Sequence, residues 1–169
     1  MTRLKVEPSE LARDGHNVML KILKAWKPER IDHEGWKPKT EHEWSESLFA
    51  HLQNVTDAVI VNKEKGSGRG REDLTLDYKY HFGKYHHAIE LKRGMNSVPK
   101  MRDLTGQITS YFKAQASYVH AVICGDEDEV DERLLRQLKE EHSGFWTKNP
   151  SIFWKKPDGG LHVILNPPV

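Results

Sequence analysis

The sequence predicts a single α/β domain in which a mixed central sheet is flanked by helices. Three observations lead to this expectation. Residues 72–93 alternate polar and apolar side chains as a β-hairpin does, helical periodicities precede and follow that segment, and residues 40–124 follow the order helix, strand, strand, strand, helix, strand. Residues 1–39 are expected to add a helix and a loop, and residues 125–169 a helix and two strands, so that 1–169 forms one domain.

The composition is that of a soluble, rather polar protein. Hydrophobic residues make up 37% and charged residues 30% of the chain, and the mean hydropathy is -0.74. No apolar run approaches the length of a membrane span, and the N-terminus lacks the apolar core of a signal peptide. The single cysteine, Cys124, excludes an internal disulfide framework and a cysteine-rich zinc site. We therefore expect a cytoplasmic, intracellular protein with no membrane partner.

The formal net charge of +1 hides an uneven distribution of charge along the chain. Residues 63–100 contain nine Lys or Arg against five acids, whereas residues 126–141 contain eight acids against three bases. A polyanion would be drawn to the basic part, which includes the hairpin. The acidic stretch is interpreted as a solvated face.

The two arms of the predicted hairpin each show the period of a half-buried strand. In the first arm, residues 73–80, polar side chains alternate with Leu and Tyr, and in the second arm Ala88, Glu90 and Lys92 share one face. A glycine near the midpoint can adopt positive φ, so Phe82 and Gly83 are the predicted turn residues.

This turn fixes a register between the two arms. It sets Thr75 opposite Glu90 and Asp73 opposite Lys92. Directly opposed residues share a face, so Asp73, Glu90 and Lys92 are expected to cluster, with the two carboxylates about 7 Å apart at the β-carbons. Asp77 is too far from Lys92 for the same cluster. A bulge in either arm would shift the register, so Asp77 remains the second choice.

Two carboxylates beside one ammonium group suit phosphodiester hydrolysis. Paired carboxylate oxygens bind a hard cation such as Mg²⁺, which keeps waters and leaves room for a phosphate oxygen. The metal can polarise that phosphate and lower the pKa of a bound water, while the lysine steadies the attacking hydroxide or the charge that develops on phosphorus.

The spacing of these residues resembles a known motif. Asp73 is followed 17 residues later by Glu90-Leu91-Lys92 within a hydrophobic strand, which resembles the PD-(D/E)xK signature of the restriction-endonuclease-like nuclease superfamily. Glu72 stands where that signature has its proline. An isolated Glu-x-Lys is also common on solvated strand faces.

The resemblance implies a fold, a cofactor and a set of site residues. It implies the αβββαβ core of the restriction-endonuclease-like fold and DNA hydrolysis that depends on Mg²⁺ or Mn²⁺ and leaves 5′-phosphate ends. Asp73, Glu90 and the carbonyl of Leu91 would bind the metal, and Lys92 would orient or activate water. The core elements would occupy residues 40–124.

A helix over residues 40–53 would open this core. Thr40 and Glu43 have the form of a capping box. The resemblance implies a metal-site glutamate near the start of this helix, acting directly or through water. Glu41 lies on the apolar stripe of the helix and is assigned this role, with Glu43 and Glu46 as the alternatives.

A second helix, over residues 101–116, would follow the hairpin. Gln107 and Tyr111 lie one turn apart on a single face of it. This pair resembles the Gln-x-x-x-Tyr element of RecB-like nucleases, and a related glutamine occurs in VRR-type nucleases. The resemblance implies that Gln107 positions the site or its substrate. The alternative is an amphipathic helix with a polar residue at its edge.

Basic residues around the motif could contact nucleic acid. Arg69 and Arg71 lie in the glycine-rich connection 63–71, which either touches the nucleic-acid backbone or serves only as a flexible turn. Arg93, directly after the motif, is assigned to the same interface.

The remaining elements follow from periodicity and turn residues. We expect a helix from about Pro8 to Trp26, a strand over 55–62, a loop over 93–100, a strand over 118–124, a helix over 127–141, and strands over 151–154 and 161–165.

The histidines and tryptophans are assigned structural roles. The histidines near the hairpin tip, His81, His86 and His87, are expected at the surface, because alternation prevents them from converging on one zinc ion. His120 is expected in the core, as are Trp26 and Trp36.

Two functions are therefore considered. The first is a Mg²⁺-dependent deoxyribonuclease, an endonuclease in DNA processing or defence, with DNA as partner and a homodimer as one assembly. The second is a catalytically inactive module on the same fold that binds nucleic acid or protein.

Overall fold

The computed structural model describes residues 3–28, 37–65, 72–144 and 148–167. Four helices and six strands occur in these residues. In chain order they are α1 (Pro8–Ala25), α2 (Glu41–Val55), β1 (Ile60–Lys65), β2 (Glu72–Tyr80), β3 (Gly83–Arg93), α3 (Val98–Lys113), β4 (Tyr118–Cys124), α4 (Glu132–Glu141), β5 (Ser151–Lys155) and β6 (Leu161–Leu165). No helix within the described ranges has both the length and the apolar character needed to cross a membrane.

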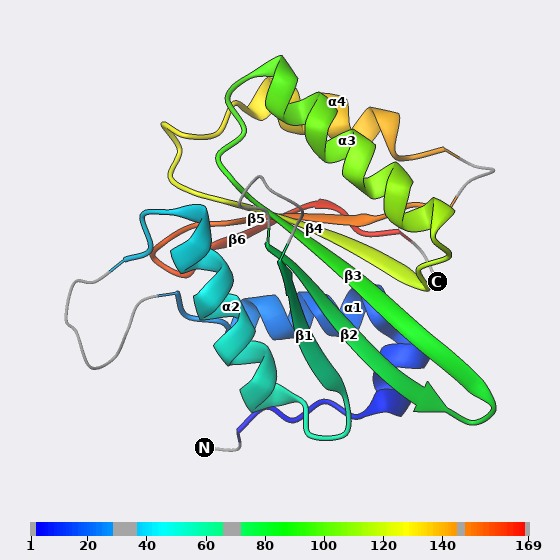
Figure 1. Ribbon diagram of the computed structural model, residues 1–169. Coiled ribbons are helices and arrows are strands. Elements are labelled where there is room, and N and C mark those ends of the chain that lie inside the picture. Colours follow the sequence, from blue (N-terminus) through cyan, green and yellow to red (C-terminus); the bar gives the residue numbers. More distant parts are fainter. Residues whose placement is uncertain (1–2, 29–36, 66–71, 145–147, 168–169) are drawn as a thin grey trace.

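All six strands belong to one mixed sheet, in which they lie side by side in chain order. β1, β2 and β3 form an antiparallel meander, β4 and β5 continue the sheet in parallel with β3, and β6 pairs antiparallel to β5. Figure 1 shows α1 and α2 on one face and α3 and α4 on the other. The predicted α/β class with a mixed, helix-flanked sheet is confirmed, as is the order of elements predicted for residues 40–124.

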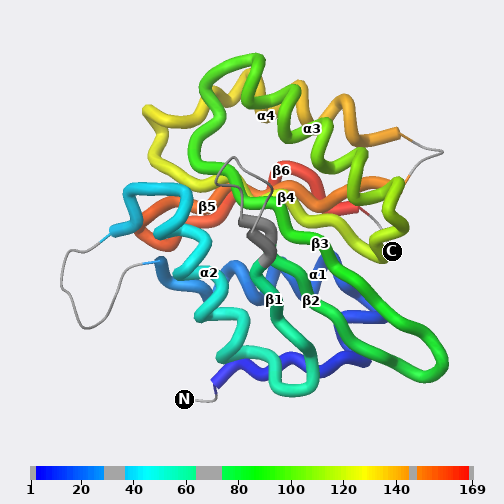
Figure 2. Tube along the Cα trace, viewed as in Figure 1, coloured from blue at the N-terminus to red at the C-terminus, as the bar shows by residue number. Residues whose placement is uncertain are grey.

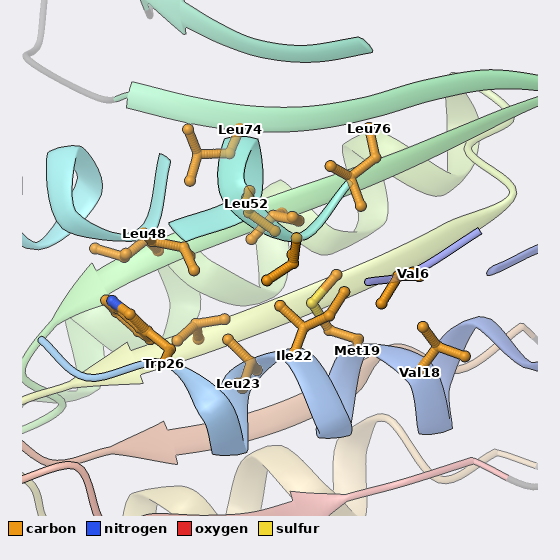
Figure 3. Packing of buried hydrophobic residues seen from close by; sticks show 14 of the residues in the cluster. Val6, Val18, Met19, Ile22, Leu23, Trp26, Leu48, Leu52, Leu74 and Leu76 are labelled. Atoms are coloured by element: carbon orange, nitrogen blue, oxygen red, sulfur yellow. The ribbon is translucent and has the colours of Figure 1, made fainter. Parts of the chain in front are cut away.

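The sheet separates two hydrophobic cores. On the α1 and α2 side, apolar side chains of both helices pack against those of β2, β3 and β4 (Figure 3). The helical side of this core includes Met19, Ile22, Trp26, Leu48 and Leu52, and the strand side includes Leu74, Leu76, Ile89 and Leu91. The core on the α3 and α4 side includes Ala88, Leu104, Ile108, Val119, Ala121, Ile123, Leu135 and Leu138. Because both faces of β3 are covered, any polar side chain on this strand needs a partner.

Several predicted boundaries are confirmed. α1 ends where expected, with Trp26 as its buried C-cap, and the strand over 118–124 matches β4. Thr40 caps α2 by accepting the Glu43 amide at 3.1 Å. The Glu43 carboxylate, however, accepts from the Thr40 hydroxyl at 3.2 Å instead of from the predicted backbone amide. Trp36 lies outside the described residues.

Three other predicted boundaries were wrong, and caps that were not predicted explain two of them. The strand predicted over 55–62 begins only at Ile60, since α2 continues to Val55. The helix predicted over 101–116 is shifted to Val98–Lys113, because Ser97 accepts the Lys100 amide and starts α3 one turn earlier.

The acidic helix also starts later than predicted. Asp131 accepts the Arg133 amide at 2.9 Å and caps α4, which therefore begins at Glu132 and not at Glu127. The preceding residues form a loop whose Val130 makes a bridge with Met95 after β3.

The predicted hairpin exists, but its register was wrong. Tyr80 pairs with Gly83, so the turn residues are His81 and Phe82, and Thr75 lies opposite Ala88. The residue with positive φ is His81, at 54°. Gly83 serves a different purpose, because a β-carbon there would lie 3.2 Å from the Tyr85 ring. The closed end of the hairpin extends away from the helices (Figure 2).

A row of hydrogen-bonded polar side chains crosses four strands on the α1 side of the sheet. Tyr78 Oη lies 2.7 Å from His87 Nε2, His87 Nδ1 lies 3.0 Å from His120 Nε2, and His120 Nδ1 lies 2.5 Å from Ser151 Oγ. The core position predicted for His120 is confirmed. The surface position predicted for His87 was wrong, since its side chain is fully buried.

These buried histidines favour the neutral form. Burial lowers the pKa of His87 to about 3 and holds the pKa of His120 well below 6.5. His16 of α1 packs edge-on against His120, and burial lowers its pKa to about 4. Within the described residues, His16 Nδ1 is buried without a hydrogen-bond partner.

A buried lysine connects α1 to the far end of the sheet. Lys155 Nζ donates to the Leu23 carbonyl at 2.6 Å and to the Gly159 carbonyl at 2.8 Å. It thus satisfies a carbonyl in the last turn of α1 and another in the β5–β6 turn. Burial lowers the pKa of Lys155 to about 8.

Acidification should destabilise the fold through the buried histidines. Their folded-state pKa values lie below the ordinary value of 6.5. The stability that they contribute is therefore complete above about pH 6.5 and is lost as the pH falls toward their folded values, by up to about 1.4 kcal/mol per histidine per pH unit. Urea unfolding at about pH 7.5 and about pH 5.5 measures this loss.

Two variants test the origin of the effect. His16→Gln removes one buried titrating ring without breaking the row of hydrogen bonds, so its stability should fall less on acidification than that of the wild type. His162→Gln, at an exposed position on β6, should respond to pH as the wild type does. An equal pH response of all three proteins would contradict the assignment.

Candidate functional site

The candidate site is centred on two ionisable side chains in the middle of the sheet. Glu90 is 1% exposed and Lys92 8% exposed, and both occupy the face of β3 that α3 covers. The side chains between and before them, Leu91 and Ile89, enter the opposite core. This division follows from the two-residue period of the strand.

α3 supplies a polar partner to each of them. Tyr111 Oη donates to Glu90 Oε2 at 2.7 Å. Lys92 Nζ donates to Asp103 Oδ2 at 2.6 Å. Both are charge-assisted bonds, which are shorter and stronger than neutral ones. They fix the direction of the carboxylate and the ammonium group, which lie two residues apart on β3.

The two partners and the predicted glutamine form one stripe on α3. Asp103, Gln107 and Tyr111 are four residues apart in turn and therefore share a helix face. Gln107 is half-buried, and its amide has no hydrogen-bond partner among the described residues. An amide on this stripe has spare donors and an acceptor beside Glu90 and Lys92.

Asp73 belongs to β2, the strand beside β3. Its side chain lies outside the part of the molecule that the structure describes, and its backbone pairs with Glu64 of β1. The β2–β3 ladder is paired from Tyr80 and Gly83 up to Leu74 and Ile89. The observed register differs from the predicted one by two residues, and such a shift leaves every side chain on its predicted face. Position 73 precedes Leu74 in β2 and position 90 follows Ile89 in β3, so both lie one step beyond the Leu74 and Ile89 pair, away from the turn.

Asp77, the second choice, has other partners. It lies opposite His86, and its carboxylate accepts from His86 Nδ1 at 2.5 Å, from Thr75 at 3.1 Å and from Asn62 at 3.2 Å. Burial raises the pKa of Asp77, but these hydrogen bonds outweigh it and hold the pKa below its ordinary value. Asp77 is four residues further from Lys92 along the hairpin than Asp73.

Glu41 lies on the other side of the sheet, in the first turn of α2. Burial, and next the charge of Glu41, raise the pKa of the Cys124 thiol well above its ordinary value. Cys124 ends β4 and belongs to the α1 and α2 core. Glu41 is therefore near the carboxyl ends of β3 and β4, whereas Glu90 faces α3. Glu46, the alternative, forms an ion pair with Lys63 of β1.

The basic residues assigned to the interface have different positions. Arg93 ends β3 and donates to Glu129 at 3.0 Å, with its side chain 44% exposed. Arg69 and Arg71 lie outside the described residues.

One acidic cluster in the described residues is compact enough to hold a metal ion. It consists of Asp126, Asp128 and Glu129 in the exposed loop after β4. The cluster contains neither Glu90 nor Glu41. Exposed acidic groups of this kind are common without an ion.

Asp103 was not predicted to belong to the site. The four-residue spacing of Asp103, Gln107 and Tyr111 could have indicated this role. It puts one acid and one phenol on a single face of the helix that follows the strand of Glu90 and Lys92. A buried lysine needs an acid, and Asp103 is the acid on that face.

Comparisons of the chain with protein-family models, with curated proteins and with solved structures found no match. The chemistry of the site itself therefore carries the functional argument.

Removal of the Tyr111 hydroxyl should destabilise the protein. In Tyr111→Phe the buried Glu90 carboxylate loses a donor at 2.7 Å, so the free energy of unfolding should fall by about 1–3 kcal/mol. Urea unfolding measures the loss. The control is Tyr80→Phe, whose hydroxyl has no hydrogen-bond partner among the described residues and whose loss should cost less than about 0.5 kcal/mol. Equal stability of the two variants would rule out a structural role for the Tyr111 contact.

Proposed function

We propose that this chain is a metal-dependent nuclease that hydrolyses phosphodiester bonds of DNA, with Glu90 and Lys92 at the centre of its site. The observation that carries the proposal is the near-complete burial of these two ionisable side chains at consecutive inward positions of a central strand. Burial of ionisable groups costs several kcal/mol each, and an apolar pair would give the sheet a more stable core. Groups that are buried at such cost cluster at functional sites.

The order of elements supports the same proposal. α2, the meander β1–β2–β3, α3 and β4 follow the αβββαβ order that the PD-(D/E)xK resemblance implies. β4 lies parallel to β3, and α3 supplies the crossover connection that a parallel pair requires. In this proposal Glu90 and Lys92 belong to the third strand of that core and Asp73 to the second.

The donor set fits a hard divalent cation. The donors considered are the carboxylates of Glu90 and Asp73 and the carbonyl of Leu91, and oxygen ligands are those that Mg²⁺ and Mn²⁺ prefer. When ionised, Glu90, Asp103 and Lys92 carry two negative charges and one positive charge, so the described part of the site favours an added cation. A bound Mg²⁺ would polarise the scissile phosphate and lower the pKa of a water.

Side chains of the protein would orient the water, stabilise charge on phosphorus and position the substrate. Asp103 accepts from the Lys92 ammonium group, which would orient the attacking water or steady the charge on phosphorus. Tyr111 fixes the Glu90 carboxylate. Gln107 lies between Asp103 and Tyr111 on α3 and would hold the substrate. Glu41 would act through water from the first turn of α2.

A binding module without catalysis is the second candidate. The observation that favours it is the burial of Glu90 itself, because a carboxylate that is 1% exposed is shielded from substrate as well as from water. In that case the two contacts with α3 would serve only to hold the helix on the sheet.

The decisive experiment measures cleavage of labelled linear, circular, single-stranded and four-way-junction DNA with Mg²⁺, Mn²⁺ or EDTA. Wild type should cut in either metal and not in EDTA. Glu90→Gln and Lys92→Met should each lower the rate at least about 100-fold, because each removes a group that acts on the reacting phosphate. Glu140→Gln, at an exposed position of α4, should cut as wild type does.

Circular dichroism spectra and unfolding curves of each variant separate lost chemistry from lost fold. Full Mg²⁺-dependent cleavage by a folded Lys92→Met protein would refute the proposal. If folded wild type is inert and binds DNA as tightly as Glu90→Gln does, the binding module is the correct function.

A further inference from the structure

The face of β3 that carries Glu90 and Lys92 continues beyond the site toward the hairpin turn. Lys84, His86 and Ala88 precede Glu90 at two-residue intervals and therefore share its face. In β2, Lys79 lies directly opposite Lys84. Directly opposed residues share a face, so both lysines are on the same side of the sheet as the candidate site.

α3 does not extend over this part of the hairpin. It packs mainly on β3 and β4 and ends at Lys113, and the chain returns to β3 at Ser117, whose hydroxyl accepts the His86 amide at 3.1 Å. Figure 1 shows the closed end of the β2–β3 hairpin projecting away from α3 and α4. The side chain of Lys79 is exposed there.

The exposed face is hollowed and basic. A hollow of about 560 Å³ lies beside Ala58, Ile60 and the hairpin. Its lining combines Asp77, Lys79, Lys84 and His86 of this face with Tyr78 and Tyr85 of the opposite face. Asp77 is occupied by its hydrogen bonds with His86, Thr75 and Asn62. Among the described residues neither Lys79 nor Lys84 has an acidic partner. Two like charges placed directly opposite each other destabilise a hairpin, so this pair is a cost to the isolated protein that an anionic ligand would remove.

We propose that the part of this face that α3 leaves open, around the Lys79 and Lys84 pair, is a docking track for the backbone of a nucleic-acid strand. The inference rests on the proposed function and describes its substrate further. Glu90 and Lys84 are six residues apart, which corresponds to about 20 Å along a strand. Within a duplex, a strand advances about 3.4 Å per nucleotide along the helix axis. Along a duplex axis the lysines therefore lie about six base pairs from the bond at the candidate site.

The hairpin tip adds a surface for an unpaired base. Phe82 is a turn residue, is fully exposed, and lies beyond Lys79 and Lys84. Bases stack on exposed aromatic rings without regard to sequence, and the loss of one such stack weakens binding by about 5- to 100-fold. The track thus suits a substrate with unpaired bases at this distance from the site.

The test measures DNA binding separately from cleavage. All variants are made in the Glu90→Gln background, and their affinity for labelled duplex and single-stranded DNA is measured by fluorescence anisotropy in EDTA over a series of salt concentrations. Lys79→Gln/Lys84→Gln should bind at least tenfold more weakly at about 0.1 M salt. The slope of log affinity against log salt should become smaller by about 1.8 for duplex and about 1.4 for single-stranded DNA, because two phosphate contacts are lost.

A matched control removes the same charge from the opposite side of the molecule. Lys21 and Lys24 are exposed on α1, which covers the other face of the sheet. Lys21→Gln/Lys24→Gln should keep the wild-type salt slope. A duplex too short to reach Lys84 from the site should be bound equally by Lys79→Gln/Lys84→Gln and by its parent.

Phe82→Ser tests whether an unpaired base stacks on the ring at the hairpin turn. It should weaken binding of single-stranded DNA by about 5- to 100-fold and leave duplex binding unchanged. Unchanged binding of single strands would remove Phe82 from the track.

The two proposals fail in different ways. If the wild type cuts DNA but the double lysine variant binds with parental affinity and salt slope, the docking track is refuted and the nuclease stands. If the wild type is inert but the double lysine variant loses affinity and salt dependence, the track stands and the nuclease is refuted.

Discussion

The arrangement of this protein depends on the burial of a carboxylate and an amine in the central strand of its sheet. Glu90 and Lys92 lie under α3, where water cannot solvate them. The helix must therefore place a phenol within hydrogen-bond distance of Glu90 and an acid within hydrogen-bond distance of Lys92. Tyr111 contacts the earlier strand residue and Asp103 the later one, so α3 runs antiparallel to β3, and its rotation about its own axis is fixed by these two contacts. The residue between them, Gln107, is held in place by the same geometry.

Much of this site could be predicted from sequence because strand alternation is a strong local signal. The shared face of Glu90 and Lys92 follows from their spacing alone, and it is insensitive to the error in hairpin register, since a slip of two residues preserves faces. The register itself could not be predicted. The sequence suggested that a glycine would take positive φ, but His81 does so, while a β-carbon at position 83 would lie 3.2 Å from the Tyr85 ring.

What the sequence could not supply were contacts between residues that are far apart in the chain. His87 is a polar residue on the strand face of Ile89 and Leu91, and its ring is satisfied there by His120, 33 residues later. Lys155 satisfies a carbonyl 132 residues away. The spacing on α3 puts Asp103 on the face of Gln107 and Tyr111, but its pairing with Lys92 depends on how α3 is placed on β3. Boundaries failed for a related reason, because the caps Ser97 and Asp131 compete with neighbouring polar residues that are equally suitable by type.

The polar row across the α1 side of the sheet has a property that no single hydrogen bond has. Each neutral histidine carries one ring proton, so a choice made at one link determines every other link. If Tyr78 donates to His87 Nε2, then His87 must donate from Nδ1 to His120, and His120 must donate from Nδ1 to Ser151. If Ser151 donates instead, the whole order reverses. The two rings must therefore be the same tautomer at any moment, and a hydroxyl on β5 governs the protonation pattern of a ring on β3, two strands away.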